Sequence, residues 1–325
     1  MTPAHAVGPT QSPSAWEAPY LRPQSLVTIA SGRRLNLVCL GDGSPTVVLD
    51  AGFGNDSLVW RKVQPLLARH TRVCAFDRAG ERFSDPGPIP RDVLASVTDL
   101  HELILAADIA RPFVLVGHSL GGMDALLYAD RYPRELAGLV LLDPGVAGTK
   151  DKFVRLTHSA EAVRRNWTHF TACAHAAETR DKDTVLSCAK QSDLTDSEFS
   201  EALNTVQLGI AAHPYLWRTL RSESEVLEST GKPTQDDHIL QRAARNLGDL
   251  PIKVIMRDEA SVTFGMPPNI GHQVWTVVQN ADAGLAKLSS RGELVLFKGS
   301  SHWVQLDQPE ETARVIFATV NVPNR

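Results

Sequence analysis

A serine lies on a sharp turn between a predicted strand and a predicted helix. The turn is residues 117–122, Gly-His-Ser-Leu-Gly-Gly, with Ser119 at its centre. Residues 113–116 are all apolar, as in a buried parallel strand, and residues 123–129 have a helical pattern. Small residues on both sides of the serine let strand and helix meet closely, which lifts the hydroxyl clear of the sheet. We interpret Ser119 as a nucleophile; the alternative is a glycine-rich loop with an incidental serine.

A serine hydroxyl becomes a good nucleophile when a nearby base takes its proton, and histidine has a suitable pKa for that role. His302 is the best placed of the eleven histidines, because it follows the last predicted strand, residues 293–297. It should therefore lie at the carboxyl edge of the sheet, where Ser119 must also lie. His118 adjoins the serine, but neighbouring residues on a tight turn point apart, so we expect it to be structural or to line the pocket.

The histidine in turn needs a carboxylate that fixes its tautomer. Asp143 directly follows the predicted strand 139–142, whereas Asp258 and Glu259 follow the strand 252–256. Each position has a simpler interpretation, as a turn, a cap or a solvated loop. The residues alone leave this choice open.

Two backbone amides are candidates for stabilising an oxyanion. The amide of Leu120 lies in the first turn of the helix that follows the serine. Phe53 lies between Gly52 and Gly54, whose small size permits close approach of a substrate to the backbone. The alternative for Phe53 is an ordinary glycine-rich turn.

Apolar runs alternate with helical patterns along most of the chain. This alternation predicts an α/β protein with a mostly parallel, doubly wound sheet covered by helices on both faces. Glycines at positions 41 and 43 predict a hairpin between the first two runs. The runs are residues 35–40, 46–50, 72–76, 113–116, 139–142, 252–256 and 293–297.

Three kinds of segment follow from these patterns. Residues 1–24 are rich in proline and are predicted to be a flexible N-terminal arm. Residues 25–147 and 248–325 hold the strands and form the predicted core. Residues 148–247 are polar and helical in pattern, with scattered aromatic residues, and are predicted to be a helical cap over the site.

The sequence resembles the α/β-hydrolase family, in particular its serine hydrolase and esterase branch with a helical cap. Residues 116–122 match the nucleophile elbow of the family, and residues 299–303 look like its terminal histidine segment. Residues 77–84 look like the family's D-x-x-G-x-G-x-S turn, although Arg82 stands where glycine is usual. The resemblance implies an α/β-hydrolase fold with Ser119 and His302 as catalytic residues.

The position of the acid departs from the usual family pattern. Most relatives carry an aspartate at the position that Ala260 occupies here. Some relatives place the acid one strand earlier, and Asp143 fits that arrangement. The resemblance therefore favours Asp143, with Asp258 as the alternative acid and Glu259 after it.

The composition limits the kinds of molecule that the protein is expected to bind. The chain has 325 residues, 43% of them hydrophobic, and a net charge of −4, with no basic stripe for nucleic acid. No apolar run approaches the roughly 18 residues of a membrane span. We expect a small-molecule substrate, no cofactor and no metal. The oligomeric state is not predicted.

Four cysteines form two local pairs, Cys39 with Cys74 and Cys173 with Cys188. Two disulfides would indicate an exported protein, and four buried thiols would suit a cytosolic one. The N-terminal residues lack the apolar segment of a signal peptide, so the localisation stays uncertain.

The predicted function is hydrolysis of a carboxylic ester of a small or medium, apolar substrate through an acyl-enzyme. The same residues would also serve a lactone, an amide or a carbon–carbon bond. A protein of another class, which binds a small ligand without turnover, is the remaining alternative.

Overall fold

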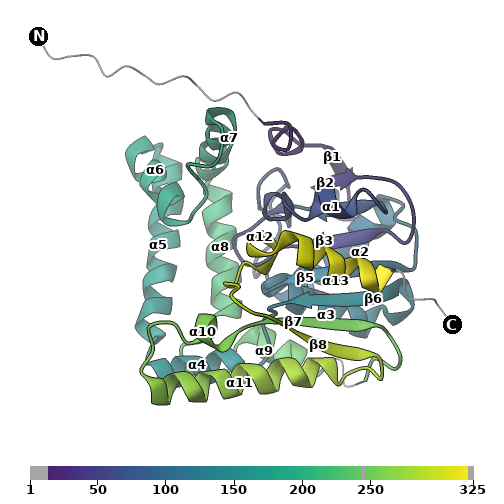
Figure 1. Ribbon diagram of the computed structural model, residues 1–325. Coiled ribbons are helices and arrows are strands. Elements are labelled where there is room, and N and C mark those ends of the chain that lie inside the picture. The colour runs from purple at the N-terminus through teal and green to yellow at the C-terminus, as the bar shows by residue number, and fades with distance from the viewer. Residues whose placement is uncertain (1–13, 244–245, 321–325) are drawn as a thin grey trace, which may run out of the picture.

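One eight-stranded sheet forms the centre of the molecule, a computed structural model that describes residues 14–243 and 246–320 (Figure 1). The strand order is β1-β2-β4-β3-β5-β6-β7-β8. Neighbours from β4 to β8 run parallel, whereas β1 and β2 are antiparallel additions at one edge. The predicted mostly parallel sheet is therefore present. Its strands are β1 (Ser25–Thr28), β2 (Arg34–Leu40), β3 (Val47–Asp50), β4 (Val73–Phe76), β5 (Phe113–His118), β6 (Leu136–Leu142), β7 (Ile252–Arg257) and β8 (Gly292–Phe297).

The predicted hairpin between the first two apolar runs is wrong. Strand β4 lies between β2 and β3, antiparallel to the first and parallel to the second. Every residue of β3 is buried, so this strand occupies a central position with a parallel neighbour on each side. The glycines at 41 and 43 mark a turn, but the tertiary packing of β3 decides its partners.

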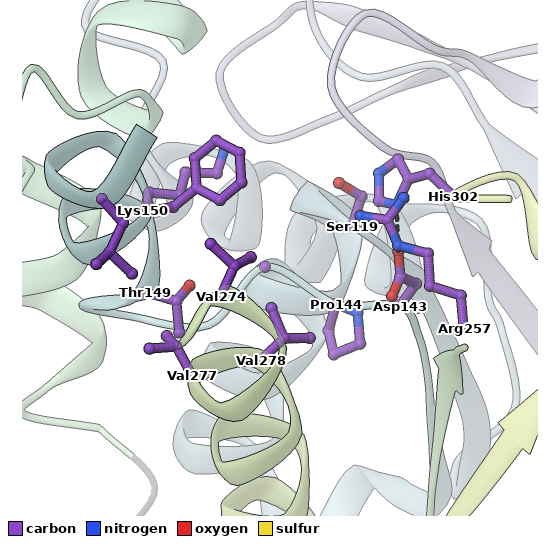
Figure 2. Close-up of a pocket in the computed structure, with 13 residues that line it drawn as sticks. Ser119, Asp143, Pro144, Thr149, Lys150, Arg257, Val274, Val277, Val278 and His302 are labelled. Atoms are coloured by element: carbon purple, nitrogen blue, oxygen red, sulfur yellow. Dashed lines mark hydrogen bonds and ion pairs between the residues drawn. The ribbon is translucent and has the colours of Figure 1, made fainter. Parts of the chain in front are cut away.

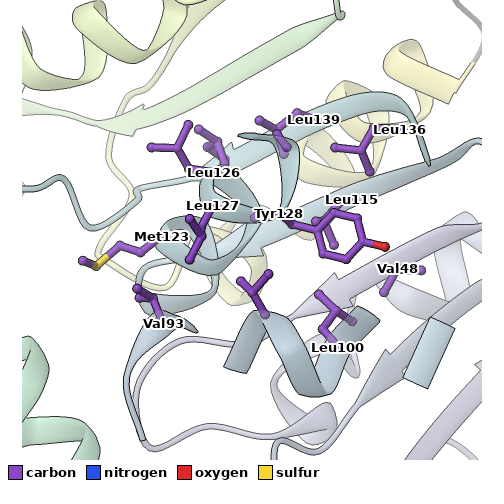
Figure 3. Close-up of a cluster of buried hydrophobic side chains, with 14 of the residues drawn as sticks. Val48, Val93, Leu100, Leu115, Met123, Leu126, Leu127, Tyr128, Leu136 and Leu139 are labelled. Atoms are coloured by element: carbon purple, nitrogen blue, oxygen red, sulfur yellow. The ribbon is translucent and has the colours of Figure 1, made fainter. Parts of the chain in front are cut away.

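Helices cover both faces of the sheet. On one face lie α1 (Gln64–Leu67) and α13 (Pro309–Val320), which pack on the central strands. On the other lie α2 (Val93–Ala106), α3 (Leu120–Arg131) and α11 (Pro268–Ala286). Figure 3 shows the hydrophobic core on this second face, in which Leu100 of α2 and Leu127 of α3 pack towards Leu115 of β5. This packing holds α3, which begins directly after Ser119, firmly on the sheet.

Helix α11 has no counterpart among the predicted elements. Its apolar residues Val274, Val278, Ala281 and Leu285 recur at helical spacing, but β-branched valines and polar residues weaken the pattern. The helix matters because it forms one wall of the cavity described below.

The described residues between β6 and β7 form six helices and no strand. Helices α5 and α8 are the longest and lie side by side at one side of the sheet, whereas α4 and α9 lie below its edge (Figure 1). This is the segment predicted to be a helical cap. The helices are α4 (Thr149–Thr157), α5 (Ala160–Thr179), α6 (Lys182–Gln191), α7 (Glu201–Ala211), α8 (Pro214–Leu227) and α9 (Gln235–Leu240).

Part of the predicted N-terminal arm packs against the rest of the protein. Residues 1–13 lie outside the described residues. The Glu17 carboxylate accepts a hydrogen bond of 2.8 Å from the Ser200 amide, directly before α7, and Tyr20 is buried. Arg82 donates to the Tyr20 carbonyl and to Gln207 of α7. Arg82 therefore connects the N-terminal segment to the helical insertion, and residues 14–24 are not a free arm.

Both cysteine pairs are disulfides. Cys39 and Cys74 lie opposite each other on the antiparallel strands β2 and β4, and Cys173 and Cys188 join α5 to α6. Among the residues placed by the structure, no helix is both long and apolar enough to cross a membrane.

Candidate active site

Ser119 occupies a strained turn between β5 and α3. Its φ angle is 52°, a value that residues other than glycine rarely adopt. A side chain at Gly117 would clash with the backbone of Gly121, and one at Gly121 would clash with the backbone of Asp50. The two glycines therefore allow α3 to start directly above the sheet, as the sequence motif predicts.

His302 and Asp143 are joined by a hydrogen bond. The Nδ1–H group of His302 donates to Oδ2 of Asp143 (Figure 2). Asp143 follows β6 and is 7% exposed, and its own amide bonds to the Ile255 carbonyl of β7. This backbone bond fixes the loop after β6 against the neighbouring strand. Ser119, His302 and Asp143 all line the same cavity.

The two alternative acids lie elsewhere. Asp258 caps the short helix α10 (Glu259–Val262), accepting from the Ser261 amide at 3.0 Å and from the Gly299 amide at 2.6 Å. These two backbone bonds hold the pKa of the Asp258 carboxyl below its usual range. Glu259 is exposed in the first turn of α10. The structure thus brings Asp143 to His302 and gives Asp258 a capping role.

Arg257 is a charged neighbour that the sequence patterns did not single out. It ends β7 and its Nε atom lies 3.1 Å from Asp143 Oδ2, an ion pair without hydrogen-bond geometry. The guanidinium and the His302 ring therefore lie next to each other at the same oxygen of Asp143, and Arg257 compensates the carboxylate charge (Figure 2). A single arginine at the end of a strand gave no sequence signal.

The loop predicted to carry one oxyanion amide is held by a buried arginine. Arg78 donates to the carbonyl of Ala51 at 2.5 Å and to that of Gly52 at 2.9 Å. Ala51 also accepts from the Gly121 amide at 3.1 Å, which ties the loop to the start of α3. The backbone that precedes Phe53 is thereby fixed beside the turn that holds Ser119.

Arg78 is the centre of a buried ionic cluster. It pairs with Asp50 at 3.2 Å, Glu81 at 2.8 Å and Glu223 of α8 at 3.4 Å, and all four side chains are almost completely buried. Burial alone would disfavour the charged guanidinium, but the carboxylates of Glu81, Glu223 and Asp50 raise the pKa of Arg78. Burial raises the pKa of Asp50 to about 6. The cluster links the loop predicted to carry one oxyanion amide to the helical insertion.

Replacing Arg78 with methionine is expected to lower the free energy of unfolding by about 3–5 kcal/mol, because several buried carboxylates would lose their counter-ion. Urea titration measures this change. Arg34→Met, which breaks the more exposed pair with Asp85, is the matched control and should cost much less. Equal losses in the two variants would contradict the proposed importance of the cluster.

His118 is buried beneath the catalytic histidine candidate. Its Nε2–H group donates to the His302 carbonyl at 2.8 Å, and the two rings lie 4.7 Å apart. Burial, with a contribution from the neighbouring His302, lowers the pKa of the His118 imidazole to about 3. His118 therefore stays neutral and holds the backbone of the loop that carries His302.

This pKa makes folding sensitive to acid. The unfolded chain gains a proton at His118 below about pH 6.5 whereas the folded chain does not, so stability is present above that pH and is lost as the pH falls towards 3. Between pH 7 and pH 5, the wild type should lose roughly 2 kcal/mol more than His118→Gln, whose amide can still donate to His302. Urea titrations at both pH values measure this; equal losses would show that His118 titrates normally.

The cavity beside Ser119 has a volume of about 360 Å³ and is formed by the sheet edge, α4 and α11 (Figure 2). Its walls combine the three predicted triad residues with apolar side chains and two cations. The lining residues are Ser119, Asp143, Pro144, Gly145, Thr149, Lys150, Phe153, Leu156, Arg257, Val274, Val277, Val278 and His302.

One group in the described chain has the ligand types of a metal site. His169, Cys173 and Cys188 lie close together in the helical insertion. The two sulfur atoms are bonded to each other, so they do not offer thiolate ligands in this state.

Comparison with known proteins identifies the family. Residues 47–315 match the model of the alpha/beta hydrolase family. The chain belongs to this family. The predicted fold class and the family resemblance are therefore confirmed, and membership supports hydrolase activity.

Individual relatives are distant. An uncharacterized protein, YqjL from Bacillus subtilis, is 23% identical over 269 residues, which cover 83% of this chain and 81% of YqjL. The meta-cleavage product hydrolase of Pseudomonas fluorescens superposes with a TM-score of 0.59 at 18% identity, over 92% of this chain and 97% of that protein. A thermophilic esterase of Thermogutta terrifontis gives 0.52 at 21% identity, over 90% and 95%. These similarities support the fold, and the substrate has to be argued from the site.

Proposed function

We propose that this protein is a serine hydrolase that cleaves a carboxylic ester through an acyl-enzyme. Ser119 is the proposed nucleophile, His302 the base and Asp143 the acid of the triad. The hydrogen bond between His302 and Asp143, in the cavity that Ser119 also lines, carries this proposal.

The geometry supports a specific role for each of the three residues. Because Nδ1 of His302 donates to Asp143, Nε2 is the ring nitrogen left to accept the proton of the Ser119 hydroxyl. Ser119 Oγ then attacks the ester carbonyl, and protonated His302 returns the proton to the departing alcohol. A water molecule, deprotonated by His302 in the same way, then attacks the acyl-enzyme. This releases the carboxylic acid product and restores the Ser119 hydroxyl. Asp143 keeps its negative charge and stabilises the imidazolium.

The oxyanion is proposed to accept hydrogen bonds from the amides of Phe53 and Leu120. Leu120 begins α3, so its amide has no carbonyl one turn earlier in the helix. Arg78 fixes the backbone before Phe53. Donors held in place before the reaction stabilise developing charge most effectively.

Residues 148–247 are proposed to act as a cap. Helix α4 contributes Thr149, Lys150, Phe153 and Leu156 to the cavity wall. The helical insertion therefore selects the substrate, whereas the sheet edge carries the chemistry.

A panel of acyl substrates tests this function. p-Nitrophenyl esters, a small lactone and an anilide should be offered to the wild type and to Ser119→Ala at equal folded concentration. We expect the ester to be hydrolysed fastest and only by the wild type. Faster turnover of the lactone or anilide would change the bond class, and equal rates in both proteins for every substrate would favour a ligand-binding role.

A further inference from the structure

The cavity contains an ammonium group without an ionic partner. Lys150, in the first turn of α4, lines the cavity together with Ser119. In the described part of the chain its ammonium forms no hydrogen bond or ion pair, and the neighbouring carboxylates act on it only at longer range. Burial of this group lowers the pKa of Lys150. Lys150 is half-buried, and a cation that is partly removed from water without a partner is disfavoured, so a ligand that supplies an anion would be favoured there.

The charges around the cavity leave Lys150 uncompensated. The other charged residues that line it, Asp143 and Arg257, pair with each other at 3.1 Å. Asp282 of α11 lies near that pair, but burial raises its pKa to about 8, so it is largely neutral at neutral pH. Asp151, next to Lys150 in the chain, pairs with Arg155 at 2.6 Å.

The acids on the side of the helical insertion each accept hydrogen bonds from other groups, although Oδ2 of Asp236 has no partner among the described residues. Glu228 accepts from the Ser224 hydroxyl at 2.7 Å, and Asp236 accepts from the Val93 amide at 3.0 Å. Asp237 accepts from the amides of Gly148 and Thr234. These carboxylates raise the pKa of Lys150, opposing the effect of burial, but none forms an ion pair with it.

Figure 2 shows Lys150 reaching from α4 towards the side of the cavity where Ser119 and His302 lie, and Val274 projecting into the cavity from α11. Val277 and Val278 continue this apolar wall. A substrate with its reacting carbonyl at Ser119 and a negative group at Lys150 would therefore place an apolar linker against these valines.

We propose that Lys150 is a specificity-determining residue that binds a substrate carboxylate. This inference rests on the proposed esterase function. The substrate class is an ester that carries a carboxylate separated from the scissile carbonyl by a short apolar linker, so the substrate is not wholly apolar.

Two matched pairs of probes test the proposal. p-Nitrophenyl hydrogen adipate and p-nitrophenyl hexanoate differ by a carboxylate on the acyl side. 4-Acetoxybenzoate and its methyl ester differ by a carboxylate on the leaving group. For each pair, kcat/KM for the anionic ester divided by that for the neutral ester gives a charge selectivity.

The expected result is that Lys150→Met lowers this selectivity about 10- to 100-fold in at least one pair, chiefly through KM, since a charge-assisted hydrogen bond is lost. Lys150→Arg should restore most of it. Lys152→Met, which removes an exposed lysine from the same helix, should leave the ratio unchanged. Thermal unfolding shows that each variant is folded.

The outcomes separate this proposal from the proposed function. If Ser119→Ala hydrolyses the neutral esters as fast as the wild type, the esterase function fails. If their hydrolysis needs Ser119 but Lys150→Met leaves the ratio unchanged in both pairs, only the carboxylate proposal is overturned. A parallel loss for anionic and neutral esters also overturns it and assigns Lys150 a structural role beside Glu228, Asp236 and Asp237.

Discussion

Replacing Ser119 with alanine is expected to lower kcat for ester hydrolysis on the order of 10⁶-fold, because no acyl-enzyme can form without the hydroxyl. The strained turn has no other nucleophile at that position: His118 is buried on one side and Leu120 begins the helix on the other. Initial rates with a p-nitrophenyl ester, at several enzyme concentrations, measure the loss.

The control is Ser290→Ala, which removes an exposed hydroxyl far along the chain from the elbow. We expect it to retain the wild-type rate. A Ser119→Ala enzyme within tenfold of the wild type, while folded to the same extent, would remove Ser119 from the mechanism.

Replacing Asp143 with asparagine is expected to lower kcat about 10⁴-fold, because an amide can no longer hold His302 in the tautomer that leaves Nε2 free to accept a proton. The matching change at Asp258 should have an effect of less than about tenfold, since asparagine caps helices as well as aspartate does. Values of kcat are compared at equal folded fraction, because Asp143→Asn also leaves Arg257 without its partner.

The comparison decides between the two acids that the sequence left open. A larger loss at Asp258 than at Asp143 would contradict the proposed triad. Parallel losses at both would indicate that the loops after β6 and β7 act together.

Local sequence patterns predicted the parts of the site that depend on local geometry. The elbow around Ser119 needs small residues at fixed offsets from the serine, and such offsets are visible in a sequence. His302 was predicted as the base because parallel strands place their following loops at one edge of the sheet. The predictions that are confirmed are the mostly parallel sheet and the family.

Features that depend on contacts between distant segments could not be predicted. The choice between Asp143 and Asp258 required the positions of the loops after β6 and β7, and the position of β4 beside β2 followed from burial of β3 on both faces. Lys150 and Arg257 both line the cavity, but they come from elements more than a hundred residues apart in the sequence. The packing of residues 14–24 involves Arg82, whose partner Gln207 on α7 is equally remote in the sequence.

The most direct test of the central claim is mass spectrometry after treatment with a fluorophosphonate, which forms a stable bond with an activated serine. We expect one added group per chain, located on Ser119 by peptide mapping, and no addition to His302→Ala, in which the hydroxyl lacks its base. Labelling at a different serine, or unchanged labelling of Ser119 after loss of His302, would contradict the proposed nucleophile and its activation.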